Sequence, residues 1–228
     1  MRINKVIAKA SIDSTSEALK RDATKVDSGT LLWAESQTKG RGTHGKKWVA
    51  SPGENLTFSF LIRHKVSYQA TLQAATALAL RDLLLAYGIE SVFKLPNDVY
   101  ASNKKIAGIL VETKTTHNNQ QTVIGVGLNV HEKFDASLPS AISMQMLNGV
   151  RCDLPTLLNA FIARYNDYIN DDAFPRFKRW VLSTPVYANY LGKTVKIVDF
   201  DTQFTYDIIV SSKSMRVDGA HLTFEIPQ

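Results

Sequence analysis

The sequence predicts an α+β fold in which a mixed β-sheet packs against helices, followed by a small all-β segment. Two observations support this prediction. Long Ala- and Leu-rich stretches occur among short strand-like runs, and only strand-like runs remain after residue 185. We therefore expect a first domain over residues 1–184 and a small C-terminal β-barrel over residues 185–228.

Two stretches have the spacing and the end signals of buried helices. Residues 67–88 carry Ala and Leu at helical spacing, and Gly88 is a natural C-terminal stop. In residues 153–171, Asp153 can cap the helix and Pro155 suits its first turn. The expected buried stripe of this second helix consists of Leu158, Phe161, Ile162, Tyr165 and Ile169.

Short runs rich in β-branched and aromatic residues predict the strands. In the first domain these runs are residues 55–62, 91–95, 106–113 and 122–130. The last two flank a polar segment, residues 114–121, and this pattern is typical of an antiparallel hairpin. The strands of the C-terminal segment are expected at residues 192–200, 205–212 and 221–226.

Composition limits the class of protein. The 228 residues are 44% hydrophobic and 21% charged, as in ordinary soluble proteins with a core. No apolar run is long enough to span a bilayer, and no apolar signal region opens the chain, so we expect a cytoplasmic protein without a membrane partner. Cys152 is the only cysteine, which excludes an internal disulfide. The net charge of +6 favours a polyanionic partner, but zinc-finger spacing and aromatic RNA-binding signatures are missing.

The stretch "ESQTKGRGTHGKKWVA", residues 35–50, combines three glycines with several cations and ends near a tryptophan, Trp48. Glycines allow such a loop to change shape and expose backbone N–H groups to phosphate, while Arg41 and Lys46 supply positive charge. A plain surface loop anchored by a core tryptophan would have the same pattern.

Glycines also interrupt the two strands of the expected hairpin. Gly108, Gly125 and Gly127 stand where β-branched residues would stabilise a strand better. Together they can open a flat slot for a ligand on the sheet, flanked by Lys105 and Asn129. The alternative for any one of them is a bulge or tight packing against another element.

Two further motifs are each open to two interpretations. In "FKLPNDVY", Pro96 ends a strand and is followed by Asn97 and Asp98. The amide of Asn97 is suited to binding a ligand and the carboxylate of Asp98 to binding Mg²⁺. The alternative interpretation is a simple Asx turn. In "IDSTSEALK", Ser14 and Glu17 have the spacing of a capping box. The free amides of that helix start favour an anion, although capping alone would explain both residues.

The segments "DSTSEAL", "QTKGRGTHGKKW", "KLPNDVY" with "KKIAGILVE", and "IGVGLNV" together resemble the biotin protein ligases, and they occur in the family's order. The resemblance covers residues 13–130 strongly and the remainder weakly. It implies the catalytic fold of those enzymes, which is similar to class II aminoacyl-tRNA synthetases, with an SH3-like C-terminal barrel. Lipoate ligases share the superfamily's fold but lack this set of motifs, and they are the closest rival. A non-enzymatic, basic nucleic-acid-binding module is the third hypothesis.

The resemblance implies a two-step ligase reaction. Biotin and ATP form biotinyl-5′-AMP, with Mg²⁺ as the metal, and the biotinyl group passes to one lysine of a biotin carboxyl carrier domain, typically of acetyl-CoA carboxylase. The matching motifs begin at residue 13, so we expect the form without an N-terminal winged helix and without sequence-specific DNA binding. A homodimer is consistent with the resemblance.

The resemblance also assigns roles to individual residues. Lys105 and Arg41 are the expected catalytic residues, and Asp98 is the expected metal contact. The expected ATP-binding residues are Lys46, Trp48, Asn97 and Asn129. The expected biotin-binding residues are Ser14, Thr15, Ser16, Gln37, Gly40, Arg41, Gly42, Thr43, Lys105 and Gly108.

The chain departs from the family's pattern at three positions in these motifs. Ser16 stands for a frequent asparagine, Leu95 for a tryptophan, and Thr43 for an arginine of the glycine-rich loop. The loop keeps other basic residues, Lys46 and Lys47 among them, that can compensate for Thr43 in part. The C-terminal segment also lacks the family's Gly-Ile-Asp stretch, with "GKTVKI" as its best match.

Overall fold

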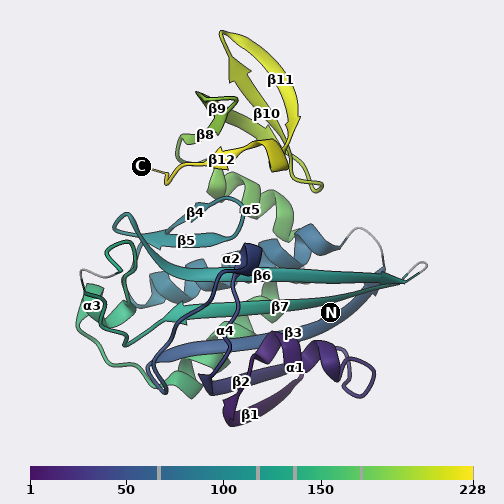
Figure 1. Ribbon diagram of the computed structural model, residues 1–228, viewed down its shortest axis with the longest axis vertical. Helices are drawn as coiled ribbons and strands as arrows, with labels where there is room; N and C mark the ends of the chain where they lie inside the picture. Colours follow the sequence, from purple (N-terminus) through teal and green to yellow (C-terminus); the bar gives the residue numbers. More distant parts are fainter. Residues whose placement is uncertain (66–67, 117–118, 136–137, 170–171, 228) are drawn as a thin grey trace.

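The computed structural model describes residues 1–65, 68–116, 119–135, 138–169 and 172–227. Its described strands form two β-sheets, one of seven strands and one of five. Figure 1 shows the smaller sheet above the larger one, with helix α5 between them. The predicted α+β class is confirmed.

The larger sheet has the strand order β1-β2-β3-β7-β6-β5-β4. Strands β1 and β2 pair in parallel and the other neighbours pair antiparallel, so the sheet is mixed, as predicted. Its strands are β1 (Lys5–Ile12), β2 (Thr30–Gln37), β3 (Asn55–Lys65), β4 (Val92–Lys94), β5 (Asp98–Ala101), β6 (Lys104–Thr116) and β7 (Asn119–Asn129).

The expected hairpin is present, with longer strands than the sequence pattern indicated. Strands β6 and β7 pair from Ala107 opposite Leu128 to Thr116 opposite Asn119. Most of the polar segment 114–121 therefore belongs to the strands, because polar side chains are tolerated where a hairpin leaves the core. The tip of the predicted turn, residues 117–118, lies outside the described residues.

Helices α2 (Gln69–Ala86) and α4 (Leu154–Tyr168) cover one face of this sheet. The even-numbered side chains of β3 point at them: Phe58 packs on Phe161 and Phe60 on Tyr165, each with ring centroids 4.8 Å apart. Gly88 follows α2 at φ +73°, in the left-handed conformation that suits a helix stop. Asp153 caps α4 by accepting the Thr156 N–H at 2.9 Å.

Helix α1 (Thr15–Arg21) lies on the opposite face. Odd-numbered side chains point this way, and Leu61 of β3 packs with Leu19 of α1 and Val123 of β7 in a separate small cluster. The rest of this face lies under the segment between β2 and β3, which contains the short 3₁₀ helix η1 (Thr43–Gly45). The glycines of β6 and β7 lie on this less covered face.

The second sheet has the order β11-β10-β9-β8-β12. Its described strands do not close on themselves, so the predicted barrel is wrong and the sheet is open. Strand β12 has only two residues, too few to continue the pairing around a barrel. The elements here are α5 (Ala173–Val181), β8 (Val186–Tyr190), β9 (Lys193–Phe200), β10 (Thr205–Val210), β11 (Lys213–Asp218), η2 (Gly219–His221) and β12 (Thr223–Phe224).

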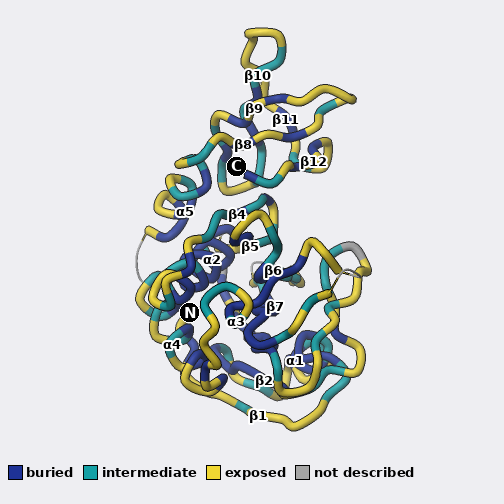
Figure 2. The backbone as a smooth tube through the Cα atoms, turned by 90° about the vertical axis from the view of Figure 1, so that its left-hand side faces the viewer, coloured by how far each residue is buried: buried dark blue, intermediate teal, exposed yellow. Residues whose placement is uncertain are grey.

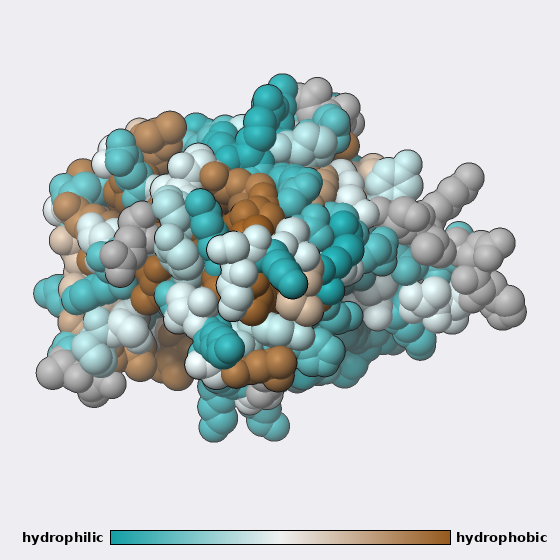
Figure 3. Space-filling view, turned by 90° about the horizontal axis from the view of Figure 1, so that it is seen from above, coloured by the Kyte–Doolittle hydropathy of each residue, from teal (hydrophilic) through white to brown (hydrophobic). Residues whose placement is uncertain are grey.

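Burial follows these layers. Figure 2 shows buried residues along α2 and the central strands, whereas β1, at the sheet's edge, is exposed along most of its length. Seen from the end that carries the second sheet, apolar residues are interrupted by hydrophilic ones (Figure 3). Among the described residues, no helix combines the length and the apolar character that crossing a bilayer would require.

Candidate active site

Three glycines lie side by side on the less covered face of the larger sheet. Gly108 of β6 is directly opposite Gly127 of β7, and Gly125 lies two residues further along β7, opposite Ser59 of β3. Side chains two residues apart on a strand share a face, so these glycines remove side-chain bulk from one continuous strip.

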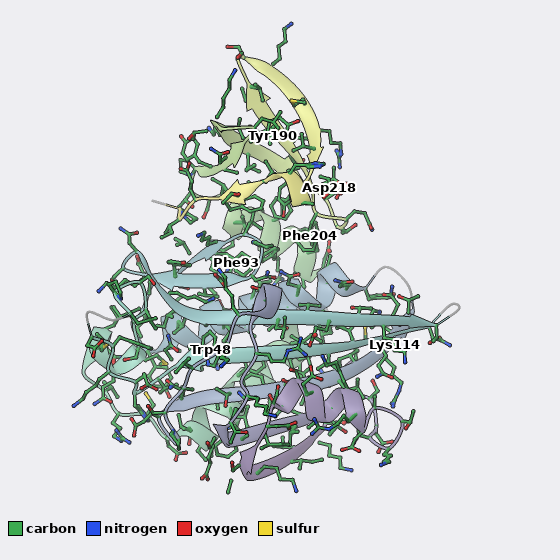
Figure 4. The ribbon with its side chains drawn as sticks, in the orientation of Figure 1. Trp48, Phe93, Lys114, Tyr190, Phe204 and Asp218 are labelled. Carbon is green, nitrogen blue, oxygen red and sulfur yellow. The ribbon has the colours of Figure 1, made fainter. Side chains whose placement is uncertain are left out.

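The indole of Trp48 packs against one end of this strip (Figure 4). A Cβ on Gly127 would lie 2.8 Å from Trp48 Cδ2, and one on Gly108 would lie 3.1 Å from Cζ3. The first distance is shorter than real contacts and the second is tighter than most, so the glycines permit the indole to lie flat on the strands. At Gly125 the nearest atom to an added Cβ is Ser59 Oγ, at 3.3 Å. The strip beyond the indole is therefore bounded by polar groups.

Those polar groups form a hydrogen-bonded wall. Gln37 Oε1, at the end of β2, accepts the backbone N–H of Thr15 at 2.8 Å and its hydroxyl at 3.2 Å. The Thr15 hydroxyl also lies 2.8 Å from Ser59 Oγ. Ser14 and Ser16 are buried beside them, with their hydroxyl oxygens 3.1 Å apart. Among the described residues the Nε2 amide of Gln37 has no hydrogen-bond partner, so it can donate to a ligand.

The start of α1 is capped on one side only. Ser14 Oγ accepts the Glu17 N–H at 3.5 Å, as a cap should, but Ser14 N–H donates to Asp13 Oδ1 at 2.8 Å instead of to Glu17. The reciprocal half of the predicted capping box is therefore wrong. The Thr15 and Glu17 amides are already bonded, so of the amides expected to be free for an anion in this first turn, only the Ser16 N–H has no partner among the described residues. The carboxylate of Glu17 is left to pair elsewhere.

Lys105 and Asp98 meet beside the indole. Strand β5 begins at Asp98, directly after the turn at Pro96, and pairs with β6 so that Asp98 lies opposite Gly108. Lys105 Nζ lies 2.6 Å from Asp98 Oδ1 and 5.6 Å from the centroid of the Trp48 ring. Both charged side chains are about 30% exposed, at 32% and 28%, so substrates can reach them.

Asn129 lies behind Lys105. Its buried Nδ2 amide donates to the Lys105 carbonyl at 3.3 Å and to the Ile142 carbonyl at 3.1 Å. The backbone of residues 140–142 also holds Lys105 by two hydrogen bonds. Lys105 N–H donates to Ser140 O at 2.8 Å, and Ile142 N–H donates to Lys105 O at 3.0 Å. Asn97 contributes its carbonyl, which accepts the Ile109 N–H at 2.8 Å. These contacts fix the backbone from which Lys105 projects.

The glycine-rich loop, residues 38–48, closes over the strip. Its internal bonds run from Gly42 N–H to Lys46 O at 2.7 Å and from Trp48 N–H to Gly40 O at 3.1 Å. Arg41 projects to the rim, where its guanidinium contacts Glu17 and lies 3.9 Å from Glu112 Oε1. Lys46 is exposed.

These elements enclose a pocket with about 470 Å³ of empty space, part of it open to solvent. Predicted site residues that line it are Ser14, Thr15, Ser16, Gln37, Arg41, Gly42, Thr43, Trp48, Asp98, Lys105 and Gly108. The others, Gly40, Lys46, Asn97 and Asn129, lie outside its lining. Sequence reasoning missed the wall residue Ser59, although a serine between Phe58 and Phe60 is the signal expected of a strand with one apolar and one polar face.

The charges in and around the pocket are balanced internally. Lys105 pairs with Asp98, and Arg41 pairs with Glu17. Among the described residues no group of three or more His, Cys, Asp or Glu side chains could hold a metal ion. A single carboxylate, that of Asp98, is compatible with one kind of Mg²⁺ site. In such a site the protein supplies one carboxylate, and phosphate and water supply the remaining ligands.

Comparisons with known proteins agree on one family. Residues 8–129 match the model of the biotin/lipoate A/B protein ligase family. The biotin–[acetyl-CoA-carboxylase] ligase of Paracoccus denitrificans is 30% identical over 190 residues, covering 78% of this chain and 74% of that protein. The bifunctional ligase/repressor BirA of Bacillus spizizenii is 30% identical over 165 residues, covering 67% of this chain and 50% of that protein.

The solved structures agree on the fold. The biotin protein ligase from Aquifex aeolicus, in complex with biotin and ATP, superposes with a TM-score of 0.79 at 24% identity, covering 97% of this chain and 99% of that one. The matches to the curated relatives are less complete: the chain spans about half the length of the first of them.

Proposed function

The chain belongs to the biotin/lipoate A/B protein ligase family, and we propose that it is an ATP-dependent biotin protein ligase. The observation that carries the proposal is the pocket itself. A flat strip of glycines, closed by an indole at one end and by a polar wall at the other, suits a small bicyclic ring with a polar ureido group. The pair Lys105 and Asp98 lies at the indole end, where the carboxylate tail of such a ligand would emerge.

The polar wall supports binding of the ureido group. The half-buried Gln37 Nε2 and the buried hydroxyls of Ser14, Ser16 and Ser59 offer donors and acceptors that are preoriented by their own bonds. A site built to hydrogen-bond one polar group rejects analogues that lack it, because its buried groups would then remain unpaired. This wall favours biotin over lipoate, whose dithiolane ring has no ureido group.

In the first step, a carboxylate oxygen of biotin attacks the α-phosphorus of ATP. The new P–O bond forms as the bond to pyrophosphate breaks, and pyrophosphate leaves with the electron pair. Lys105 balances the negative charge that builds on the carboxylate and α-phosphate in the transition state, a role that needs no proton transfer. Arg41 and Lys46 add positive charge from the loop.

In the second step, the ε-amine of a carrier lysine attacks the carbonyl of biotinyl-5′-AMP. The C–N bond forms, the C–O bond to AMP breaks, and the amine proton passes to solvent. The mixed anhydride hydrolyses readily, so a loop that closes over it and excludes water favours transfer over loss. Trp48 and the glycines beside it supply that closure.

Mg²⁺ would neutralise the phosphates of ATP, with Asp98 as its carboxylate contact. The pairing of Lys105 with Asp98 offsets the charge of that lysine, which supports a counter-cation for the phosphates. Asn97 and Asn129 would serve the nucleotide side, Asn129 by fixing the backbone at Lys105.

The proposed acceptor is a biotin carboxyl carrier domain of an acetyl-CoA carboxylase, in the cytoplasm. Two relatives, from Mycobacterium tuberculosis and Paracoccus denitrificans, are biotin–[acetyl-CoA-carboxylase] ligases. We assign catalysis to residues 1–184 and treat residues 185–228 as a small C-terminal β domain.

The test is transfer to a purified carrier domain in the presence of ATP and Mg²⁺, with either biotin or lipoate. We expect label on the carrier with biotin only. Label with lipoate would instead support the lipoate ligase alternative, and no label with either would contradict a ligase function.

Lys105→Ala is the companion variant, and Lys104→Ala, one residue before it on the same strand, is the matched control. Loss of Lys105 should slow formation of biotinyl-5′-AMP about a hundred- to a thousandfold, in line with removal of one preorganised electrostatic donor. The control should remain within about twofold of the parent protein. A folded Lys105→Ala protein that forms the adenylate at the parent rate would show that this role is misassigned.

A further inference from the structure

We propose that Glu17 and Glu112 are positioning residues that act through Arg41 and hold the glycine-rich loop closed over the site. The identity of the retained molecule, the acyl-adenylate, rests on the proposed function. The contacts that carry the proposal rest on the structure alone.

Four charged side chains from three separate segments meet at the rim of the pocket. Glu17 and Lys20 come from α1, Arg41 from the loop and Glu112 from β6. The Arg41 guanidinium contacts Glu17 and lies 3.9 Å from Glu112 Oε1. Lys20 Nζ bridges the two carboxylates, at 2.6 Å from Glu17 Oε1 and 2.8 Å from Glu112 Oε1. The lysine therefore offsets the repulsion that two adjacent carboxylates would otherwise exert on each other.

Besides Arg41, the Glu17 carboxylate pairs only with Lys20, on its own helix, among the described residues. The helix cap does not use it, because Ser14 N–H donates to Asp13. Glu17 does not line the pocket, nor do Lys20 and Glu112, whereas Arg41 does. The two carboxylates thus reach the pocket only through the arginine.

Arg41 is the ion-pair link between the loop and the body of the protein. Among the side chains that the structure describes in residues 39–47, it alone forms an ion pair. The loop's other contacts are the packing of Trp48 on the glycine strip and backbone hydrogen bonds within the loop and at its root, such as Thr38 N–H to Ile12 O at 2.9 Å. Loop glycines lose much conformational freedom on closing, so a side-chain anchor shifts the balance toward the closed form.

The strength of this anchor suits a lid that must open. Arg41, Glu17 and Glu112 are 42%, 31% and 26% exposed, so water and salt screen their attraction. Partly exposed pairs of this kind contribute modestly, and networks contribute more than single pairs. The loop can therefore release each time a carrier lysine must enter. Thr43, at the pocket, adds no charge to the closure, so the electrostatic part of the hold falls on Arg41 and its two partners, beside the packing of Trp48.

The first test needs no substrate. Ligand-free protein is treated with trypsin, and cleavage after Lys46 and Lys47 is followed by mass spectrometry for the parent and for Glu17→Gln and Glu112→Gln. Glu35→Gln, an exposed carboxylate on β2 that makes no ion pair among the described residues, is the matched control. We expect Glu17→Gln to raise the cleavage rate about two- to fivefold and Glu112→Gln less, because its carboxylate is farther from Arg41.

Salt and a conservative variant separate a charge effect from a packing effect. The difference between Glu17→Gln and the parent should disappear at about 1 M NaCl, where screening is short-ranged. Glu17→Asp, which keeps the charge, should restore part of the parent's resistance. Cleavage of Glu17→Gln at the parent rate, or an equal rise in Glu35→Gln, would overturn the proposal.

The second test concerns the intermediate. Release of preformed radiolabelled biotinyl-AMP should speed up in Glu17→Gln by a similar factor, while the rate of its formation changes less than about twofold. Equal release rates in a variant with a more open loop would also contradict the proposed role. If the parent protein forms no biotinyl-AMP, the proposed function fails, and the trypsin comparison still decides whether Glu17 and Glu112 hold the loop.

Discussion

The indole of Trp48 and the missing side chain of Gly127 fit together at the floor of the pocket. Gly127→Ala would place a methyl carbon 2.8 Å from Trp48 Cδ2, so the indole must move. Overpacking of this kind costs about 1–3 kcal/mol, and here the cost falls on the closed loop. We expect weaker biotin binding by calorimetry and faster tryptic cleavage at Lys47.

Gly125→Ala provides the comparison for this prediction. An added methyl there meets the Ser59 hydroxyl at 3.3 Å and leaves the indole untouched. This variant should weaken biotin binding without changing cleavage at Lys47. Equal cleavage rates for the two glycine variants would contradict the link between Gly127 and the loop.

Thr43 is the residue at which the loop departs from its family's pattern. A hydrogen bond to a charged group contributes about 1.5–3 kcal/mol, so an uncompensated loss would speed adenylate release about ten- to a hundredfold. The pairing of Arg41 with Glu17 is a compensation. Thr43→Arg should therefore slow release only several-fold and leave adenylate formation nearly unchanged. A chase of radiolabelled biotinyl-AMP with unlabelled biotin and ATP measures the release rate. Equal release rates for the two proteins would show that Thr43 does not weaken retention of the adenylate.

The elements that the sequence predicted are those with a strong apolar pattern. Helix α4 buries one stripe and its periodicity predicts it, whereas α2, β3 and most of β7 are buried on nearly all sides and are predicted by their dense apolar composition. Strand β1 was missed because it is an edge strand exposed along most of its length, so its sequence, KVIAKASI, has no buried face to reveal. Helix α5 was missed because it is short and contains Pro175, which a helix tolerates only in its first turn.

Without the family resemblance, the site was predictable only where neighbours in the sequence are also neighbours in the pocket; the resemblance alone joined the segments around Ser14, Gln37 and Lys105. The motif residues Asp98, Lys105 and Gly108 meet through one hairpin, which local spacing indicates. The contact of Glu112 with Arg41, by contrast, joins residues that are distant in the chain, and no local signal marks it. The same is true of Ser59, whose partner Thr15 lies 44 residues away.

One connection between elements predicts a pH dependence. His131 follows β7 and is buried; its Nε2 accepts the Cys152 N–H at 3.0 Å. Burial, and then the nearby Arg151, lower the pKa of His131 below 6.5. The unfolded chain therefore binds this proton more readily than the folded one, so the stabilising contribution is complete above about pH 6.5 and is lost as the pH falls toward the folded pKa.

The variant His131→Gln tests this connection, since an amide oxygen can still accept from Cys152 but does not titrate. The free energy of unfolding, measured by urea denaturation between pH 5 and 8, should fall less steeply below about pH 6.5 in the variant than in the parent. Parallel curves for the two proteins would show that His131 titrates alike in the folded and unfolded chains.

On the scale of the whole molecule, the two sheets share one aromatic cluster around α5. Phe177 of α5 packs edge-on against Phe93 of β4, with centroids 4.8 Å apart, and against Phe200 of β9 at 6.1 Å. Phe177 is fully buried, and Figure 4 shows Phe93 on the side of the larger sheet that faces α5. The smaller sheet is therefore not an independent appendage, because its core ring Phe200 and the ring of Phe93 contact the same side chain.

Phe177→Ala should consequently destabilise and uncouple the molecule. Truncation of a buried phenylalanine costs about 3–5 kcal/mol, and here the loss falls on the contact between the sheets. We expect the denaturant transition of the parent to split or broaden, with the smaller sheet unfolding first. Phe204→Ala is the matched control: its half-buried ring stacks on Phe200 within the smaller sheet, at 6.5 Å, and should cost less without separating the transitions. A single sharp transition in Phe177→Ala, with the parent's dependence on denaturant, would show that α5 does not couple the two sheets.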